Sequence, residues 1–414
     1  MNTLFPNEWR TLEQALQMTA DSLTVHGSQH RHWCLAFSGG KDSSAALAAT
    51  VYLIESGAIP RPETLTILYA DTRLELPNLQ AAAVKMLAAV RARGFETITV
   101  YPKLDKRFYV MMFGRGIPPS HSGFRWCTGA LKVDPMAEAM EGIRNRVGEK
   151  ILLITGMRIG ESANRDRRIA LSCSGKNGGE CGQGWYEETT PAEVADVLSP
   201  ILHWRTCHVW DWLMLHGHGR AKPSHGFDCS LVAEVYDQDA DGSAQEVLAR
   251  TGCLVCPVAS RDYALERTIR KPEWAYLAPL HRLRDLYTEL TKPHNRLRKY
   301  GERTASGNLS ANPMRSGPLL MHARESGLRT VLAIQDEVND AAASACPPKL
   351  EIDLINAEEE ARIRELIAAN TWPDKWTGEE HDGSEPLPEI HRDGTVQNLL
   401  WQVQESESVQ GGTN

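Results

Sequence analysis

Apolar and polar positions follow two different periods along the first 155 residues of the chain. Short apolar runs of strand length alternate there with segments of helical spacing. Strands that alternate with helices of this length predict a parallel twisted sheet with helices on both faces, in the α/β class. The predicted strands are 33–37, 65–70, 96–101 and 150–155, and the predicted helices are 8–25 and 77–93.

The regular pattern breaks after about residue 170, where the glycine-rich stretch 173–182 predicts a loop. Charged segments with helical spacing dominate from Trp274 onward, and we expect helices over 278–300, 319–341 and 357–370. Three ranges follow: an α/β domain with inserted cysteine-containing loops over 1–270, a helical C-terminal extension over 271–377, and a loosely ordered tail over 378–414.

The formal charge of −8 argues against a chain that binds nucleic acid through its overall electrostatics, although Arg and Lys gather locally at 165–168 and 292–303. No apolar run approaches the roughly 20 residues that cross a bilayer, and the N-terminus lacks a signal-peptide pattern. We therefore expect a cytoplasmic protein without membrane contact. In that compartment nine cysteines favour metal ligands, redox thiols or core residues over disulfides.

The turn between the first strand and the following helix reads Ser-Gly-Gly-Lys-Asp-Ser-Ser. Its two glycines permit positive φ and close backbone approach, and its N–H groups, hydroxyls and lysine predict a nest for a pyrophosphate. The spacing is not that of a Walker A loop. The predicted phosphate-binding residues are Ser38, Gly39, Gly40, Lys41, Asp42, Ser43 and Ser44.

Ligands of parallel sheets bind at the carboxyl ends of strands, which points to the residues after the second and fourth strands. Asp71 follows the second strand and is predicted to contact Mg²⁺ or the nucleotide, with a turn cap as the alternative. Arg158 follows the fourth strand, and its planar guanidinium suits the charge on a leaving pyrophosphate. Surface salt bridges are the alternative for Arg158, Glu161 and Arg165.

These motifs resemble known ones. Ser-Gly-Gly-Lys-Asp-Ser resembles the PP-loop of the ATP pyrophosphatases, enzymes with an adenine nucleotide alpha hydrolase-like fold that cut ATP between its α and β phosphates. The stretch 156–165, G-x-R-x-x-E-S-x-x-R, resembles a segment of sulfate adenylyltransferase small subunits and of DndC-type DNA phosphorothioation proteins. That resemblance adds Glu161, Ser162 and Arg165 to the predicted nucleotide-binding residues. The stretch 199–213 resembles a PAPS-reductase-like segment.

The cysteines carry a second candidate site. Cys253 and Cys256 form a CxxC, which alone is compatible with a redox pair, zinc or an iron–sulfur site. Cys127 lies in an element that resembles the R-W-C-T-x-x-L-K-x-x-P segment of PAPS-reductase-like and DndC proteins, whose cysteine joins a downstream CxxC on a 4Fe–4S cluster. The usual fourth cysteine before the CxxC is absent. Cys229 is its predicted replacement, with Cys181 as a further candidate, while zinc and metal-free thiols stay open.

The resemblance covers about residues 30–270 and is greatest to the DndC and SspD proteins of DNA phosphorothioation. It implies an enzyme that uses ATP and Mg²⁺ to adenylate an acceptor, the DNA backbone, for sulfur incorporation. Sulfur would come from a cysteine desulfurase, and the acidic chain suggests that DNA is bound through partner subunits. The predicted catalytic residues are Lys41, Asp42, Arg158 and Cys127.

Three alternatives remain. A sulfonucleotide reductase needs a catalytic cysteine near its C-terminus, where this chain has only Cys346. A sulfate adenylyltransferase-like enzyme shares the loop but does not need the CxxC. A non-enzymatic nucleotide-binding subunit is disfavoured by the intact Lys41 and Asp42.

Overall fold

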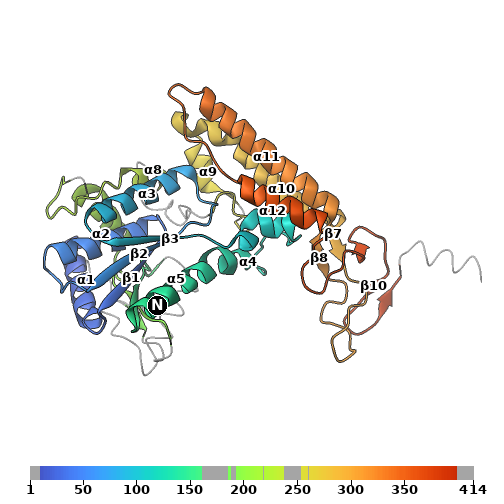
Figure 1. Cartoon of the computed structure of the whole chain (residues 1–414), viewed down its shortest axis with the longest axis horizontal. Coiled ribbons are helices and arrows are strands. Elements are labelled where there is room, and N and C mark those ends of the chain that lie inside the picture. The colour runs from blue at the N-terminus through green and yellow to red at the C-terminus, as the bar shows by residue number, and fades with distance from the viewer. Residues whose placement is uncertain are drawn as a thin grey trace, which may run out of the picture. The chain divides into compact units, whose positions relative to one another are not determined.

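The computed structural model describes residues 10–160, 185–187, 193–217, 219–236, 253–259 and 261–398, with main chain alone for 185–187 (Figure 1). The chain divides into two compact units. The N-terminal unit comprises Met1–Pro102, Gly129–Leu254 and Asp262–Pro272. The C-terminal unit comprises Lys103–Thr128, Val255–Arg261 and Glu273–Asn414.

The N-terminal unit is built on a six-stranded sheet in the order β3-β2-β1-β4-β6-β5. The first five strands of this order are parallel, and β5 pairs antiparallel with β6 at the edge. This arrangement confirms the predicted α/β class. The strands are β1 His32–Phe37, β2 Thr64–Ala70, β3 Glu96–Val100, β4 Ile151–Ile154, β5 Trp185–Glu187 and β6 Ala195–Ser199.

Helices cover both faces of this sheet, as predicted. Leu35 and Phe37 of β1 pack into a large core together with α1, α2 and α3. Cys34, between them in sequence, packs on the opposite face with Ile143 of α5, because successive side chains of a strand point to opposite sides. The helices are α1 Leu12–Gly27, α2 Lys41–Glu55, α3 Pro77–Ala92, α5 Asp134–Val147, α7 Thr206–Trp210, α8 Ser230–Tyr236 and α9 Tyr263–Thr268.

The four predicted strands agree with β1 to β4 within one residue at each end, whereas β5 and β6 were not predicted. In β6 the apolar pattern is interrupted by Asp196, which is buried and accepts from Lys150 Nζ at 2.5 Å and contacts His30 Nε2 at 2.8 Å. A carboxylate in a buried strand is stable only with such partners, and these partners come from distant parts of the sequence. The apolar period therefore could not indicate this strand.

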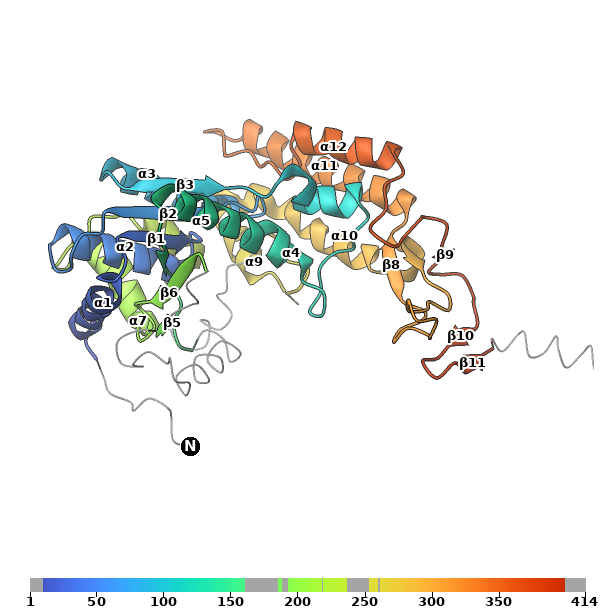
Figure 2. The same cartoon turned by 60° about the horizontal axis from the view of Figure 1, so that its bottom comes forward.

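The C-terminal unit contains the helices α10, α11 and α12 (Figure 2). It also contains a small antiparallel sheet of order β8-β7-β9. The predicted helix 278–300 is wrong beyond Leu290, because Pro293 cannot donate a helical hydrogen bond and the chain turns into β7. None of the described helices combines the length and apolar content needed to span a bilayer. The elements are α4 Trp126–Thr128, a 3₁₀ segment Pro272–His281, α10 Arg282–Leu290, β7 Arg296–Arg298, β8 Ser316–Leu319, α11 Met321–Ser344, α12 Ala357–Ala368, β9 His381–Asp382, β10 Glu389–Ile390 and β11 Val396–Gln397.

Residues 103–128 belong to the C-terminal unit although they precede β4 in sequence. A Cβ on Gly327 of α11 would lie 2.3 Å from the Phe113 ring, and one on Gly114 would lie 2.7 Å from Leu366 Cδ1 of α12. Asp105 accepts two bonds from Arg362 of α12, at 2.7 and 2.9 Å. These contacts hold the segment against α11 and α12.

The two compact units therefore differ from the predicted domains, which are the linear ranges 1–270, 271–377 and 378–414. These ranges stay a prediction of the functional domains. Residues 378–398, predicted to be loosely ordered, form the strands β9, β10 and β11. Glu380 ties this region to the unit through an ion pair with Lys299 at 2.6 Å. The remainder of the predicted tail, 399–414, lies outside the described residues.

Candidate functional site

The loop between β1 and α2 has the strand–turn–helix conformation that its sequence predicts. Gly39 has φ +75°, a conformation that side-chain-bearing residues rarely adopt, and a Cβ there would lie 2.9 Å from Ala83 Cβ of α3. Gly40 is the N-cap of α2, which begins at Lys41. The turn thus needs glycine at position 39 for both its backbone angle and its packing.

Hydroxyl groups occupy the inside of this loop. Ser43 Oγ accepts from Ser38 N–H at 3.2 Å, lies 3.0 Å from Ser38 Oγ and donates to Gly40 O at 3.0 Å. Lys41 N–H donates to the Tyr236 hydroxyl at 3.3 Å. A phosphate oxygen is a stronger acceptor than a hydroxyl, so an anion can replace these bonds. The Ser44 hydroxyl is buried without a hydrogen-bond partner among the described residues.

Asp42 connects the loop to the residues after β4. Its Oδ2 accepts from Lys41 Nζ at 2.8 Å and its Oδ1 from Arg158 Nε at 2.6 Å. Arg158 is buried, with 5% of its surface exposed, and its Nη1 donates at 3.2 Å to both Trp204 O and Thr206 Oγ1. This geometry favours Arg158 as a positioning residue for the loop, since direct contact with a pyrophosphate would require it to leave these partners.

Asp71 lies at the carboxyl end of β2, the strand beside β1. Phe37 pairs with Tyr69, so the residues after both strands emerge at the same edge of the sheet. The Asp71 carboxylate is buried and accepts from Arg73 N–H at 2.8 Å and from Gln80 Nε2 at 3.1 Å. It therefore caps a turn in this structure, which was the alternative expectation, and its contact with Mg²⁺ stays a prediction.

Three predicted nucleotide-binding residues, Glu161, Ser162 and Arg165, lie outside the described residues.

The four predicted cluster ligands divide between the units: Cys229 and Cys253 belong to the N-terminal one, Cys127 and Cys256 to the C-terminal one. Cys229 is fully buried in the apolar core, and burial raises the pKa of its thiol to about 12. Within the described ranges no group of three or more His, Cys, Asp or Glu is arranged to hold a metal ion. Cys229 is therefore a core residue in this structure, and the four-cysteine 4Fe–4S cluster stays a prediction.

Cys256 lines a pocket of about 210 Å³ in the C-terminal unit. Ser120, His121 and Tyr287 also line it, and the Ser120 hydroxyl is buried with no hydrogen-bond partner in the described structure. The pocket leaves one thiol of the CxxC beside polar groups. Its Ser120 and His121 were not predicted as site residues.

Tyr236 is a site residue that sequence reasoning missed. Its hydroxyl contacts the loop at Lys41 N–H, its ring lies 5.4 Å from Lys41 Nζ, and a Cβ on Gly40 would lie 3.1 Å from its oxygen. The two partners are 195 residues apart in sequence, and no motif surrounds the tyrosine. Only packing of α8 beside the loop brings them together.

Residues 32–219 match the phosphoadenosine phosphosulfate reductase domain, and the matched range contains Lys41, Asp71 and Arg158. The chain is 25% identical over 224 residues to the uncharacterized protein MJ0973 of Methanocaldococcus jannaschii, and 24% identical over 228 residues to MJ0066 of the same organism. Each alignment covers 54% of this chain but only 41% and 35% of the two relatives. The chain thus spans less than half the length of the curated relatives it matches.

Two solved structures are also similar to the chain. The phosphoadenylyl-sulfate reductase of Candida auris, in a phosphate complex, is 11% identical with a TM-score of 0.33, covering 57% of this chain and 96% of that one. The FMN adenylyltransferase of Candida glabrata, in complex with FMN and the ATP analogue AMPCPP, is 15% identical with a TM-score of 0.34, covering 59% and 68%.

Proposed function

We propose that the chain is an ATP pyrophosphatase that cuts ATP between its α and β phosphates and transfers the adenylyl group to an acceptor. The observation that carries this proposal is the glycine turn at the carboxyl end of β1. There the hydroxyls of Ser43 and Tyr236 accept hydrogen bonds from loop N–H groups that a phosphate could also receive, and Lys41 Nζ lies in the same loop. The β and γ phosphates would replace the hydroxyl partners of the loop. Lys41 would then offset the charge that develops on the leaving pyrophosphate.

Asp71 is the carboxylate that we propose for the magnesium ion of Mg·ATP. Its two oxygens each accept one hydrogen bond from the protein, and each carboxylate oxygen has a further lone pair. The ion would neutralise phosphate charge, while Asp71 stays anchored by its turn. Asp42 keeps the loop in place through Arg158.

The acceptor is proposed to be the DNA backbone, with sulfur delivered by a cysteine desulfurase to Cys127. Support comes from the motifs at 38–43, 125–135 and 156–165, which resemble those of DNA phosphorothioation proteins. The match to the phosphoadenosine phosphosulfate reductase domain agrees with an enzyme of sulfur chemistry. DNA from cells with and without the gene, digested to dinucleotides, tests this part: phosphorothioate linkages should depend on the gene.

A sulfonucleotide reductase is the second candidate, and the match to the reductase domain favours it. Its reaction would consume phosphoadenosine phosphosulfate and a thiol, without consuming ATP. In this chain the cysteine nearest to the expected position, Cys346, is exposed just after α11.

Product analysis separates the two activities. Purified protein with Mg·ATP and acceptor DNA should release pyrophosphate and leave the adenylyl group bonded to the DNA, because the nest holds the two outer phosphates as one leaving group. Products are resolved by anion-exchange chromatography of radiolabelled ATP. ADP with orthophosphate would contradict the proposal, and sulfite release from phosphoadenosine phosphosulfate without ATP use would favour the reductase.

Gly156→Ala is expected to weaken ATP binding by about tenfold or more. A Cβ at this position would lie 2.8 Å from both Cα and N of Ser43, so the first turn of α2 must move away from the phosphate-binding conformation. Binding of a non-hydrolysable ATP analogue, measured by calorimetry, checks this.

Gly142→Ala in α5 is the matched control, because a Cβ there meets nothing within 4 Å. It should bind the analogue normally and gain up to about 1 kcal/mol of stability, since alanine is the better helix former. Equal affinities for both variants would argue against a phosphate site at this loop.

A further inference from the structure

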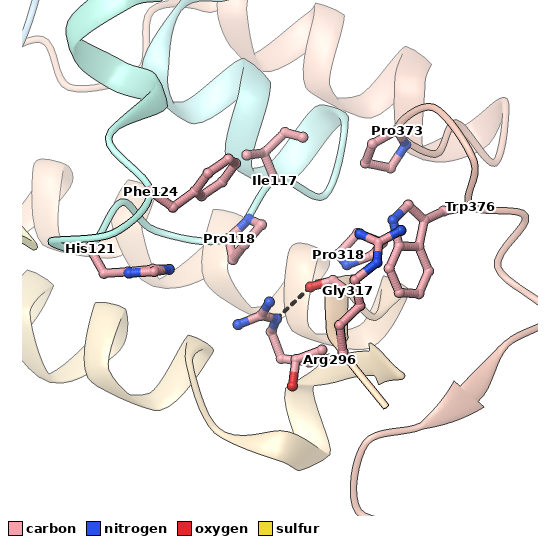
Figure 3. A pocket seen from close by; sticks show the side chains of 11 residues that line it. Ile117, Pro118, His121, Phe124, Arg296, Gly317, Pro318, Pro373 and Trp376 are labelled. Atoms are coloured by element: carbon pink, nitrogen blue, oxygen red, sulfur yellow. Dashed lines mark hydrogen bonds between the residues drawn. The ribbon is translucent and has the colours of Figure 1, made fainter. Parts of the chain in front are cut away.

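A second pocket, of about 300 Å³, lies within the C-terminal unit (Figure 3). Segment 117–124, the β7–β8 pair and the turn after α12 form its walls. None of its lining residues is acidic, although the chain as a whole carries a net charge of −8. Its polar side chains include Arg296, Arg315 and His121.

Arg296 supplies a charge that the described residues do not neutralise. Its Nε donates to Gly317 O at 2.5 Å, and no carboxylate of the described chain forms an ion pair with it. Partial burial lowers the pKa of its guanidinium. Arginine side chains are not deprotonated in proteins, so the group is a cation. In Figure 3 one edge of the guanidinium faces Gly317 and the other turns towards Pro118 and His121, into the pocket.

The neighbouring cations differ from Arg296 in this respect. Arg315 forms two bonds of 2.6 Å with Glu302, and Lys299 pairs with Glu380 at 2.6 Å. Both also lie over the Trp376 ring, at 5.0 and 4.5 Å from its centroid. Their charges are thus compensated, and the unneutralised charge in the pocket wall is that of Arg296.

The remaining walls are flat and apolar. Trp376 and Gly317 are in such close contact that a Cβ on the glycine would lie 2.1 Å from the indole, which fixes the ring in the wall. Phe124 is 44% exposed, and it lines the pocket together with Pro118 and Pro373. Such rings stack well on planar heterocycles, in a manner that tolerates different bases.

We propose that this pocket binds a nucleotide, with its phosphate on Arg296 and its base against Phe124. A guanidinium without a protein carboxylate suits phosphate oxygens, and the aromatic and proline walls suit a base. The nucleotide is either free or one unit of a single strand, since both present the same phosphate and base. This site is separate from the Lys41 loop and does not depend on the function proposed for it.

His121 also lines the pocket of Cys256. The pocket proposed for the phosphate therefore shares one wall residue with the pocket that Cys256 lines.

Binding is tested in the full-length Lys41→Ala background, so that the β1–α2 loop does not contribute. The probes are inorganic phosphate and deoxyadenosine 5′-monophosphate, by calorimetry, and a labelled single-stranded oligodeoxyadenylate of about ten nucleotides, by fluorescence anisotropy. Arg296→Gln should weaken the binding of all three by about tenfold or more. Arg298→Gln, two residues along the same strand and outside the pocket wall, is the matched control and should bind normally.

Phe124→Ala provides a second test that does not threaten the fold, because the ring is exposed. It should weaken the nucleotide and the oligonucleotide but not inorganic phosphate. Much tighter binding of the oligonucleotide than of the mononucleotide would assign the site to a nucleic-acid strand, and equal affinities would assign it to a free nucleotide. Absence of binding by every probe, or equal losses in Arg296→Gln and Arg298→Gln, would overturn the proposal.

Discussion

Lys41→Ala is expected to lower the rate of pyrophosphate release from ATP by a factor of about a hundred or more while the protein stays folded. Lys41 lies in the first turn of α2, beside the hydroxyls that hold the loop closed. Within the described structure its ammonium makes one hydrogen bond, to Asp42, whereas Arg158 is buried and bonded to Asp42, Trp204 and Thr206, so Lys41 is the cation that we expect to contact the phosphates. Removing it leaves charge on the leaving group without a protein partner.

The fold should tolerate this change for two reasons. Asp42 keeps its bond to Arg158, so the loop stays anchored to the residues after β4. Alanine is also a good helix former at the start of α2.

Lys85→Ala in α3 is the control for loss of a lysine. Lys85 pairs with Asp228 at 2.5 Å, and its side chain is 49% exposed, so activity should not change. Pyrophosphate release is followed by an enzyme-coupled assay, and unfolding by circular dichroism. Retention of more than about a third of the activity in Lys41→Ala would refute the assigned role.

Arg324→Met is expected to destabilise the C-terminal unit by about 3–5 kcal/mol. Arg324 of α11 is completely buried, and burial lowers the pKa of its guanidinium to about 10, so it remains protonated at neutral pH. It donates to the carbonyl oxygens of Phe113, Gly114 and Thr371. Methionine fills much of the same space but leaves these buried acceptors without donors.

The exposed Arg364 of α12 is the control, since its partner among the described residues is Glu360 on the surface of its own helix. Arg364→Met should change stability by no more than about 0.5 kcal/mol. Urea unfolding checks both variants, with probes in each unit because two units need not unfold together. A change below about 1 kcal/mol for Arg324→Met would show that water or rearrangement replaces the lost donors.

The helices, strands and turns that could be predicted from the sequence are those that depend on residues close together in the chain. Strands β1 to β4 and helices α2, α3, α11 and α12 follow from apolar periods, which depend only on residues a few positions apart. The loop before α2 follows from its glycines, since the positive φ of Gly39 is a property of that position alone. Helix 278–300 was overextended because the pattern was followed through Pro293.

The contacts of individual side chains were harder to predict from the sequence than the helices and strands. Cys229 was grouped with the CxxC by its nearness in the chain, yet it packs in the core beside Phe227. Asp71 caps its own turn, which was the alternative expectation, and its contact with Mg²⁺ stays a prediction. Residue type and spacing predict what a group can do, but burial and partners decide its protonation and its contacts.

The sequence by itself determined the α/β sheet, the position and conformation of the glycine loop, and the helical character of the C-terminal region, because these depend on short-range periodicity and turn chemistry. Only the tertiary structure decided that Tyr236 contacts this loop, that residues 103–128 pack on α11 and α12, and that Arg296 lines a pocket in which no described carboxylate pairs with it. Each of these joins residues far apart in the chain. Close packing of side chains from separate elements creates such contacts, and a linear pattern carries no record of them.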